Sequence, residues 1–153
     1  VLFGAAGISK HAAALGAHGA DVVFVVEHAG FTHNNPEAAS ATLADKVKGG
    51  YAGVVLAASA TGKDVAPRVA AKLGVPMASD VTSLTVSGNG ITCTHPGYTG
   101  KVIQTVTLTA TPAVVSVRPG AFLPKENAKA GTVETLAPSG DPSAARVKVT
   151  ETA

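Results

Sequence analysis

Short runs of β-branched residues alternate with alanine-rich segments from Val1 to Gly74. Short valine-rich runs are typical of buried strands, and alanine-rich segments with apolar residues at every third or fourth position are typical of helices. Parallel strands need a crossover connection, which is usually a helix. The alternation therefore predicts an α/β domain in which parallel strands are joined by helices.

Three strand and helix units are predicted in this region. The strand at 21–27 is apolar on both faces, as expected for a parallel strand with helices on both sides. Pro36 suits the first turn of a helix, and Gly49 and Gly50 are expected to end that helix. The predicted strands are 1–3, 21–27 and 53–57, and the first two predicted helices are 8–18 and 36–48.

The third predicted helix follows the strand at 53–57. Pro67 has no N–H to donate, so it is expected in the first turn, with the N-cap near Asp64. Gly74 is expected to end the helix. Because alanine lets a helix approach a sheet closely, the core is predicted to be rich in valine and alanine. Residues at helical spacing are predicted to face the sheet: Val65, Ala66, Val69, Ala70 and Leu73.

The second half of the chain has a different pattern. Threonine and valine alternate over 82–87, 91–94 and 101–109, which predicts antiparallel strands with one polar face that meets water or a partner. Gly88-Asn89-Gly90 predicts a hairpin turn between the first two strands. A further buried strand is predicted at 113–117.

Polar and helix-breaking residues dominate the segment 120–153. Only 132–136 and 146–150 alternate apolar and polar residues there, which predicts two short edge strands. We therefore expect one α/β domain over 1–119 and an extension over 120–153.

Composition excludes several classes of function. The 12 Lys and Arg and the 10 Asp and Glu are interspersed, and aromatic residues are 4% of the chain, so no basic stripe or stacking platform for nucleic acid is present. The longest obvious apolar run, Val22–Val26, is far shorter than the roughly 20 residues of a membrane-spanning helix. The single Cys93 cannot form an internal disulfide, which favours a reducing, intracellular compartment.

Two glycine-containing turns match phosphate-binding loops incompletely. Gly62-Lys63 precedes a helix, but Ala57 stands in place of the first glycine of the Walker pattern. Asp64 stands in place of the hydroxyl residue that binds magnesium. The turn Gly4–Gly7 lacks the third glycine and the distal acid of a dinucleotide-binding turn. Both segments are predicted to be ordinary strand-to-helix turns.

The histidines and the cysteine form no recognised catalytic or metal-binding pattern. His11 and His18 provide two ligands at most and lack a third. His28 and His33 flank a loop at the carboxyl end of a strand, where open α/β sheets bind ligands. Cys93 lies in a predicted strand and is expected to be a packed small residue.

Two arginines are candidates for binding a carboxylate with both branches of the guanidinium group. Arg68 lies on the third predicted helix, where a structural ion pair is expected. Arg118 directly follows a buried strand, so it is expected at the carboxyl edge of the sheet. By chemistry alone, the sequence predicts no active site.

Four segments share residues with one known family. The most specific is the run Ala57–Leu73, which is followed by Ser79-Asp80-Val81. Thr94–Lys101 is similar to a Thr-Arg-Pro-x-Tyr-Ala-Gly segment, and Ser116–Phe122 resembles the end of a last core strand. They follow one another in this order within residues 50–122, and they resemble the N-terminal domain of the electron transfer flavoprotein alpha subunit.

The resemblance implies a Rossmann-like fold of the adenine nucleotide alpha hydrolase-like kind. That fold is an open, mostly parallel sheet with flanking helices, to which the second half adds antiparallel strands. The resemblance also implies an electron carrier rather than an enzyme with its own substrate. Its heterodimer passes electrons from dehydrogenases, as in fatty acid oxidation, to a quinone-linked acceptor.

In that family the cofactor FAD is held chiefly by a C-terminal domain of the alpha subunit, which is expected to be absent here. No FAD-binding residue is therefore expected in this fragment, whose implied role is to act as a scaffold and to bind the beta subunit. A first strand and helix are also expected to be missing ahead of Val1. The implied compartment is the cytoplasm of a bacterium or the mitochondrial matrix, without membrane insertion or nucleic-acid binding.

The chain departs from the family pattern at two positions. His95 replaces the usual arginine and Thr99 replaces the usual alanine, so an arginine contact at this segment is expected to be weakened. Contacts with a partner or a second domain are expected at Lys63, Asp64, Arg68, Tyr98 and Arg118.

The residues leave two alternative functions open. A free-standing adenine-nucleotide-binding α/β module is indicated by the Gly62-Lys63 turn and by the loop at 28–33. A small metal-dependent or hydrolytic enzyme would use His28, His33 or Cys93, and this hypothesis rests on residue type alone.

Overall fold

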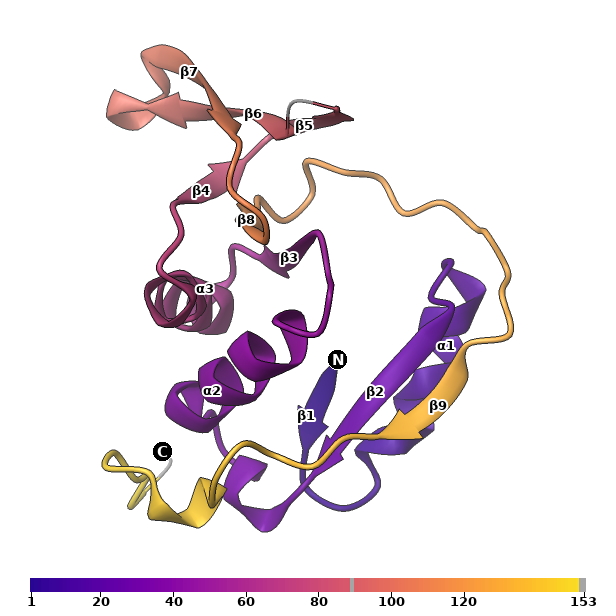
Figure 1. Ribbon diagram of the computed structural model, residues 1–153. Helices are drawn as coiled ribbons and strands as arrows, with labels where there is room; N and C mark the ends of the chain where they lie inside the picture. Colours follow the sequence, from indigo (N-terminus) through magenta and orange to yellow (C-terminus); the bar gives the residue numbers. More distant parts are fainter. Residues whose placement is uncertain (89, 152–153) are drawn as a thin grey trace. The chain divides into compact units, whose positions relative to one another are not determined.

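Figure 1 shows the computed structural model, which describes residues 1–88 and 90–151. By its internal contacts the chain divides into two compact units, one made of residues 1–42 with 124–153 and the other of residues 43–123. Each unit has its own sheet of parallel strands, and the second unit adds an antiparallel sheet. The predicted α/β class, with antiparallel strands in the second half, is confirmed.

The sheet of the first unit has three parallel strands in the order β1-β2-β9. They are β1 (Leu2–Gly4), β2 (Val22–Glu27) and β9 (Thr132–Thr135). Both faces of β2 contribute to the core, because Val25 and Val26 point to opposite faces and both are buried. The prediction for this strand is confirmed.

The helix predicted over 36–48 is confirmed to within one residue, and the helix predicted over 8–18 is confirmed only in part. The segment predicted as one helix over 8–18 is a 3-10 turn followed by a short α-helix. The helix predicted over 36–48 begins after Asn35, whose Oδ1 accepts a hydrogen bond from the N–H of Ala38 at 3.1 Å. The boundary between the two units, after Thr42, falls within this helix. The helical segments are η1 (Ile8–His11), α1 (Ala12–Ala17), η2 (Ala29–Phe31), α2 (Pro36–Val47) and η4 (Pro142–Ala144).

The last part of the chain was predicted to contain two edge strands. The first, at 132–136, is confirmed as β9, which lies at the edge of its sheet. The second, at 146–150, is wrong, because these described residues form no strand. The N–H and the Nε of Arg146 instead donate to the carboxylate of Glu37, at 3.1 and 3.0 Å. A side-chain contact thus takes the place of strand pairing.

The parallel sheet of the second unit has the order β3-β8-β4. Its strands are β3 (Gly53–Ala57), β8 (Ala113–Val117) and β4 (Met77–Val81). The strands predicted at 53–57 and 113–117 are confirmed, and the central strand β8 is buried from Ala113 to Ser116. β4 was not predicted, because polar residues near its end interrupt the apolar pattern.

Helix α3 (Ala60–Leu73) begins earlier than predicted. Ser59 is the N-cap, and its Oγ accepts a hydrogen bond from the N–H of Gly62 at 3.2 Å. The predicted N-cap near Asp64 is therefore wrong, and Pro67 lies inside the helix on its exposed side. Gly74 ends the helix with a positive φ of 67°, as predicted. The buried residues of α3 are Gly62, Val65, Ala66, Val69 and Ala70, whereas Leu73 is half-buried.

The antiparallel sheet of the second unit has the order β5-β6-β7. Its strands are β5 (Ser83–Ser87), β6 (Gly90–Gly97) and β7 (Val102–Leu108), with the 3-10 turn η3 (Tyr98–Gly100) between the last two. The antiparallel strands are confirmed, and the predicted turn residue Asn89 lies outside the described residues.

The antiparallel sheet has one apolar and one polar face. Cys93 and Leu108 are buried on the apolar face, where they pack with residues of β4 and β8. The hydroxyl oxygens of Thr92 and Thr107 lie 3.0 Å apart on the other face. Most buried core residues of the chain are valine or alanine, as predicted. Within the part of the chain that the structure describes, no helix has the length and apolar character needed to cross a membrane.

Candidate functional site

The carboxyl ends of β3, β8 and β4 meet at one edge of the parallel sheet in the second unit, the edge at which open sheets of this kind bind ligands. Arg118 directly follows β8, and Asp80 is the penultimate residue of β4. Lys63 lies near the beginning of α3, the helix that follows β3. His95 lies on β6. We refer to Lys63, Asp80, His95 and Arg118 together as the charged edge.

Asp80 has an unusual backbone conformation. Its φ is 55°, in the left-handed region that few residues other than glycine, asparagine and aspartate adopt. The pairing of β4 with β8 shifts register between Ala78 and Val81 at this point. The N–H of Asp80 donates to the Oγ of Ser116 at 3.2 Å, and Ser116 is only 1% exposed. A buried hydroxyl on β8 therefore holds the irregular end of β4.

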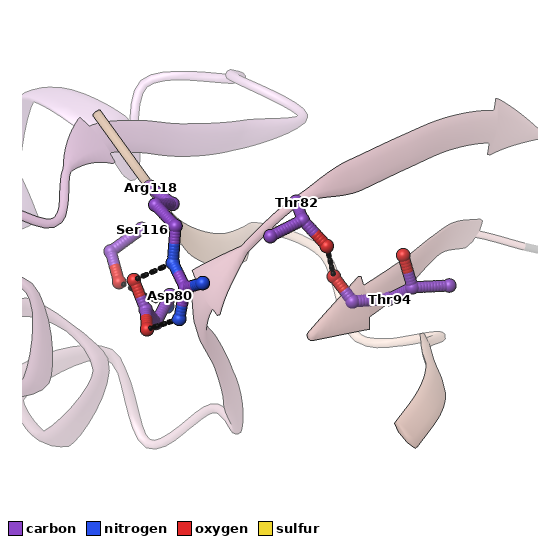
Figure 2. Close-up of polar contacts among 5 residues, drawn as sticks. All are labelled: Asp80, Thr82, Thr94, Ser116 and Arg118. Atoms are coloured by element: carbon purple, nitrogen blue, oxygen red, sulfur yellow. Dashed lines mark hydrogen bonds and ion pairs between the residues drawn. The ribbon is translucent and has the colours of Figure 1, made fainter. Parts of the chain in front are cut away.

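The side chain of Asp80 faces Arg118, as Figure 2 shows. The Nε of Arg118 donates to Oδ1 at 3.1 Å, and its Nη2 donates to Oδ2. Both carboxylate oxygens are thus used by one guanidinium group, which is the strongest arrangement for this kind of pair. The backbone N–H of Arg118 also donates to the carbonyl of Val81 at 2.9 Å. Together these bonds fix the end of β4 to the end of β8.

The charges at this edge shift the acid–base properties of the pair. The hydrogen bonds from Arg118 lower the pKa of the Asp80 carboxyl, and burial opposes this shift. The electrostatic effects of Arg118, Lys63 and His95 lower that pKa further. The same pair raises the pKa of Arg118. Asp80 is therefore an ionised counter-ion at neutral pH rather than a group that exchanges protons.

The turn from β3 into α3 is too tight for any residue with a side chain at Gly62. A Cβ atom at Gly62 would lie 1.7 Å from the carbonyl oxygen of Ala57. The N–H of Gly62 donates to the hydroxyl of Ser59, and the N–H of Lys63 donates to the Ser59 carbonyl at 2.8 Å. The second bond is the first regular bond of the helix, whereas the N–H of Gly62 is one of the free donors that a phosphate-binding loop would offer to its ligand. The turn is therefore an ordinary helix start, as predicted.

The first unit shows a similar arrangement at the turn after β1. The Oε1 of Glu27 accepts hydrogen bonds from the N–H of Gly7 at 3.0 Å and from the N–H of Ser9 at 3.2 Å. These bonds, first of all the one from Ser9, lower the pKa of Glu27. A carboxylate of the chain itself thus occupies the donors of this turn. The prediction that Gly4–Gly7 is no dinucleotide-binding turn agrees with this geometry.

The structure brings only some of the predicted contact residues together. Lys63 and Arg118 both act on Asp80, which is not among the predicted contact residues. Arg68 instead pairs with Asp64 one helical turn away, with Nε and Oδ1 2.8 Å apart, as expected of a structural ion pair. Tyr98 lies in η3 and is 76% exposed.

The histidines and the cysteine have structural surroundings. The Nδ1 of His28 accepts a hydrogen bond from the N–H of Gly30 at 3.0 Å, which caps η2. His33 borders an open cavity of about 230 Å³ in the first unit, lined mainly by residues of the loop 29–35 and the segment 142–149. Cys93 is fully buried, and burial raises the pKa of its thiol. No group of three His, Cys, Asp or Glu side chains suited to a metal ion occurs among the described residues.

Comparison with known proteins identifies the family. The model of the electron transfer flavoprotein domain matches residues 1–141. The alpha subunit of the electron transfer flavoprotein of Syntrophomonas wolfei is 32% identical over 134 residues, which are 87% of this chain and 42% of that protein. A probable mitochondrial alpha subunit of Caenorhabditis elegans is 34% identical over 125 residues, 81% of this chain and 36% of that protein.

A third relative is the protein FixB of Clostridium saccharobutylicum, which is 32% identical over 112 residues, 71% of this chain and 34% of that protein. The chain thus spans between about a third and two fifths of the length of these relatives. The match of the family model covers nearly the whole described chain, and it includes both units. The chain belongs to the electron transfer flavoprotein family, and it is a domain of the alpha-subunit type.

Proposed function

We propose that this chain is the scaffold and subunit-binding domain of an electron transfer flavoprotein alpha subunit. In this role it carries no redox group itself and catalyses no reaction on a substrate of its own. Electrons from dehydrogenases pass through FAD, which is held mainly outside this chain, to a quinone-linked acceptor. The bacterial and mitochondrial relatives support a site of action in the bacterial cytoplasm or the mitochondrial matrix.

One observation carries the proposal: in both turns that partly match phosphate-binding loops, backbone N–H groups are bonded to side chains of the chain itself. The carboxylate of Glu27 accepts hydrogen bonds from the N–H groups of Gly7 and Ser9, and the hydroxyl of Ser59 accepts one from the N–H of Gly62. A nucleotide or flavin would have to displace these contacts before its phosphates reached the backbone. This arrangement supports a scaffold more than a cofactor-binding module.

The proposal also concerns the arrangement of the alpha subunit. In this proposal residues 1–119 are its α/β domain, and residues 120–153, whose strand β9 pairs with β2, are an extension that leads toward the part that holds FAD. The residues expected to contact the beta subunit or a second domain are Lys63, Asp64, Arg68, Tyr98 and Arg118. Their exposure, which ranges from partial to nearly complete, supports this role.

Co-purification tests the proposed function. The full-length gene product is expressed with a tagged beta subunit, and the complex is isolated and examined by absorbance spectroscopy. We expect a one-to-one complex with the absorbance of a flavin. A gene product that elutes without the beta subunit, or a complex without a flavin spectrum, would contradict the proposal.

A further inference from the structure

The second unit carries an excess of positive charge. Between residues 43 and 123 the chain has seven Lys and Arg side chains and three Asp side chains. Each aspartate already has a partner, because Asp45 pairs with Lys48, Asp64 with Arg68 and Asp80 with Arg118. All three carboxylates of this unit are therefore already engaged by a cationic side chain.

Part of this excess charge gathers at the charged edge. Arg118 uses both oxygens of Asp80, so that carboxylate has no oxygen left without a partner. Lys63 and His95 act on Asp80 only through their charge, from beyond ion-pair distance. Lys63 is exposed, and no carboxylate of the described residues lies within ion-pair distance of its Nζ. The edge therefore presents an unneutralised cation beside a guanidinium group that is itself 44% exposed.

We propose that Lys63 and Arg118, with His95 beside them, dock an acidic segment of the beta subunit. This inference rests on the proposed function and adds the chemistry of the contact. Charge complementarity is the argument, since a partner that presents aspartate or glutamate here would supply the carboxylates that the unit lacks.

The shape of the edge favours side-chain carboxylates over a phosphate group. A phosphate is normally held by several backbone N–H groups that point at one spot. At this edge the N–H of Gly62 donates to the hydroxyl of Ser59, and the N–H of Asp80 donates to the hydroxyl of Ser116. What the edge offers is separate cationic side chains. Such an arrangement suits carboxylates spread along a polypeptide segment.

Helix α3 offers a matched pair of variants. Lys63 lies near its beginning and Lys72 lies in its last turn, and both side chains are exposed. Lys63→Glu and Lys72→Glu change the net charge of the chain by the same amount. A negative charge is favourable near a helix N-terminus and unfavourable near its C-terminus. A loss of stability would therefore affect K72E more than K63E, so weaker binding of K63E alone cannot result from unfolding.

The experiment measures the affinity of the full-length alpha chain for the purified beta subunit at several salt concentrations. We expect the affinity of the unmodified chain to fall as salt rises. At low salt we expect K63E to bind about tenfold more weakly. K72E is expected to stay within about twofold, and Lys63→Arg is expected to bind like the unmodified chain, because it keeps the charge.

The results separate the two proposals. If K63E and K72E both bound the beta subunit as tightly as the unmodified chain does, the docking inference would be overturned and the proposed function would remain intact. Equal losses in both variants would show an effect of net charge only and would also overturn it. An unmodified chain that binds no beta subunit at any salt concentration would contradict both. Selective, salt-sensitive weakening of K63E would support the inference.

Discussion

Asp80 and Arg118 are joined by two hydrogen bonds between their side chains, although 38 positions separate them in the sequence. The pair connects the carboxyl ends of β4 and β8, and the buried hydroxyl of Ser116 holds the backbone of Asp80 from the same strand as Arg118. Three side chains thus fix the edge of the sheet at which the two strands lose their regular pairing.

Substitution of Asp80 should separate the effect of its charge from that of its backbone conformation. Asparagine tolerates a positive φ, whereas alanine does not. We expect Asp80→Asn to lower the melting temperature because the charged pair is lost. Asp80→Ala should lower the melting temperature further, because alanine is less favourable than asparagine at a positive φ. Thermal unfolding followed by circular dichroism measures both values.

Asp64→Asn is the matched control for these variants. Asp64 pairs with Arg68 one turn along α3, where both side chains are partly exposed and such pairs contribute only about 0.3–0.5 kcal/mol. We expect a small change in melting temperature for this variant. A loss as large as that of Asp80→Asn would mean that the edge pair has no special structural role.

The acid side of the stability profile should depend on Asp80 and Glu27. Both carboxyls have pKa values below their ordinary values in the folded chain. The unfolded chain therefore binds more protons in the acid range, so these groups stabilise the fold at neutral pH. We expect this contribution to be lost progressively below about pH 5. Urea unfolding at a series of pH values measures it.

Two variants test the assignment of that pH dependence. Glu27→Gln and Asp80→Asn remove the titrating groups, so each should flatten the fall in unfolding free energy between neutral and acid pH. The double variant should flatten it more than either single variant does. Profiles parallel to that of the unmodified chain would show that other carboxyls cause the acid loss.

Gly62 should tolerate no side chain. Its Cβ would lie 1.7 Å from the Ala57 carbonyl oxygen, and because this is a backbone atom it cannot turn away. We expect Gly62→Ala to cost about 3 kcal/mol or more, at the upper end of what overpacking costs. Chemical denaturation measures the loss, provided that the variant remains folded enough to be purified.

Gly74→Ala provides the comparison for that variant. Gly74 has a φ of 67° but nothing within 4 Å of the position of a Cβ. Alanine at this position would meet no steric clash but would have to adopt an unfavourable backbone conformation, which lowers the free energy of unfolding by about 1–2 kcal/mol. If Gly62→Ala proved milder than Gly74→Ala, the tight turn described for α3 would be incorrect.

Cys93 should behave as a core residue rather than a nucleophile. It is fully buried, and burial raises the pKa of its thiol, so little thiolate is present at neutral pH. We expect a thiol reagent to react slowly with the folded chain and rapidly in denaturant. Rapid labelling of the folded chain would restore the hypothesis that Cys93 takes part in catalysis.

The elements defined by local pattern were predictable, and the contacts between distant residues were not. The strands 53–57 and 113–117 have the predicted ends, because an apolar run bounded by polar or glycine residues needs no distant information. The predicted start of α3 is wrong because proline is most often found in the first turn of a helix, whereas this helix begins at the cap residue Ser59 and contains Pro67 in its interior.

The charged edge illustrates the same limit. Arg118 was selected because it follows a buried strand, and the structure indeed places it at the carboxyl edge. Its partner Asp80 is part of the family resemblance only, because nothing in its local sequence predicts a left-handed conformation or a contact with Ser116. Likewise, Glu27 was placed in a strand, but its bonds to Gly7 and Ser9 depend on how that strand pairs with β1.

Calorimetric titration tests the central claim most directly, because it compares the two kinds of ligand on the same sample. The full-length alpha chain is titrated separately with the beta subunit and with AMP or ATP in the presence of magnesium. The proposed function predicts saturable heat with the beta subunit, and it predicts that Glu27→Gln and Lys63→Glu leave the titration with either nucleotide unchanged. Saturable nucleotide binding that Glu27→Gln or Lys63→Glu alters, together with no response to the beta subunit, would contradict the account.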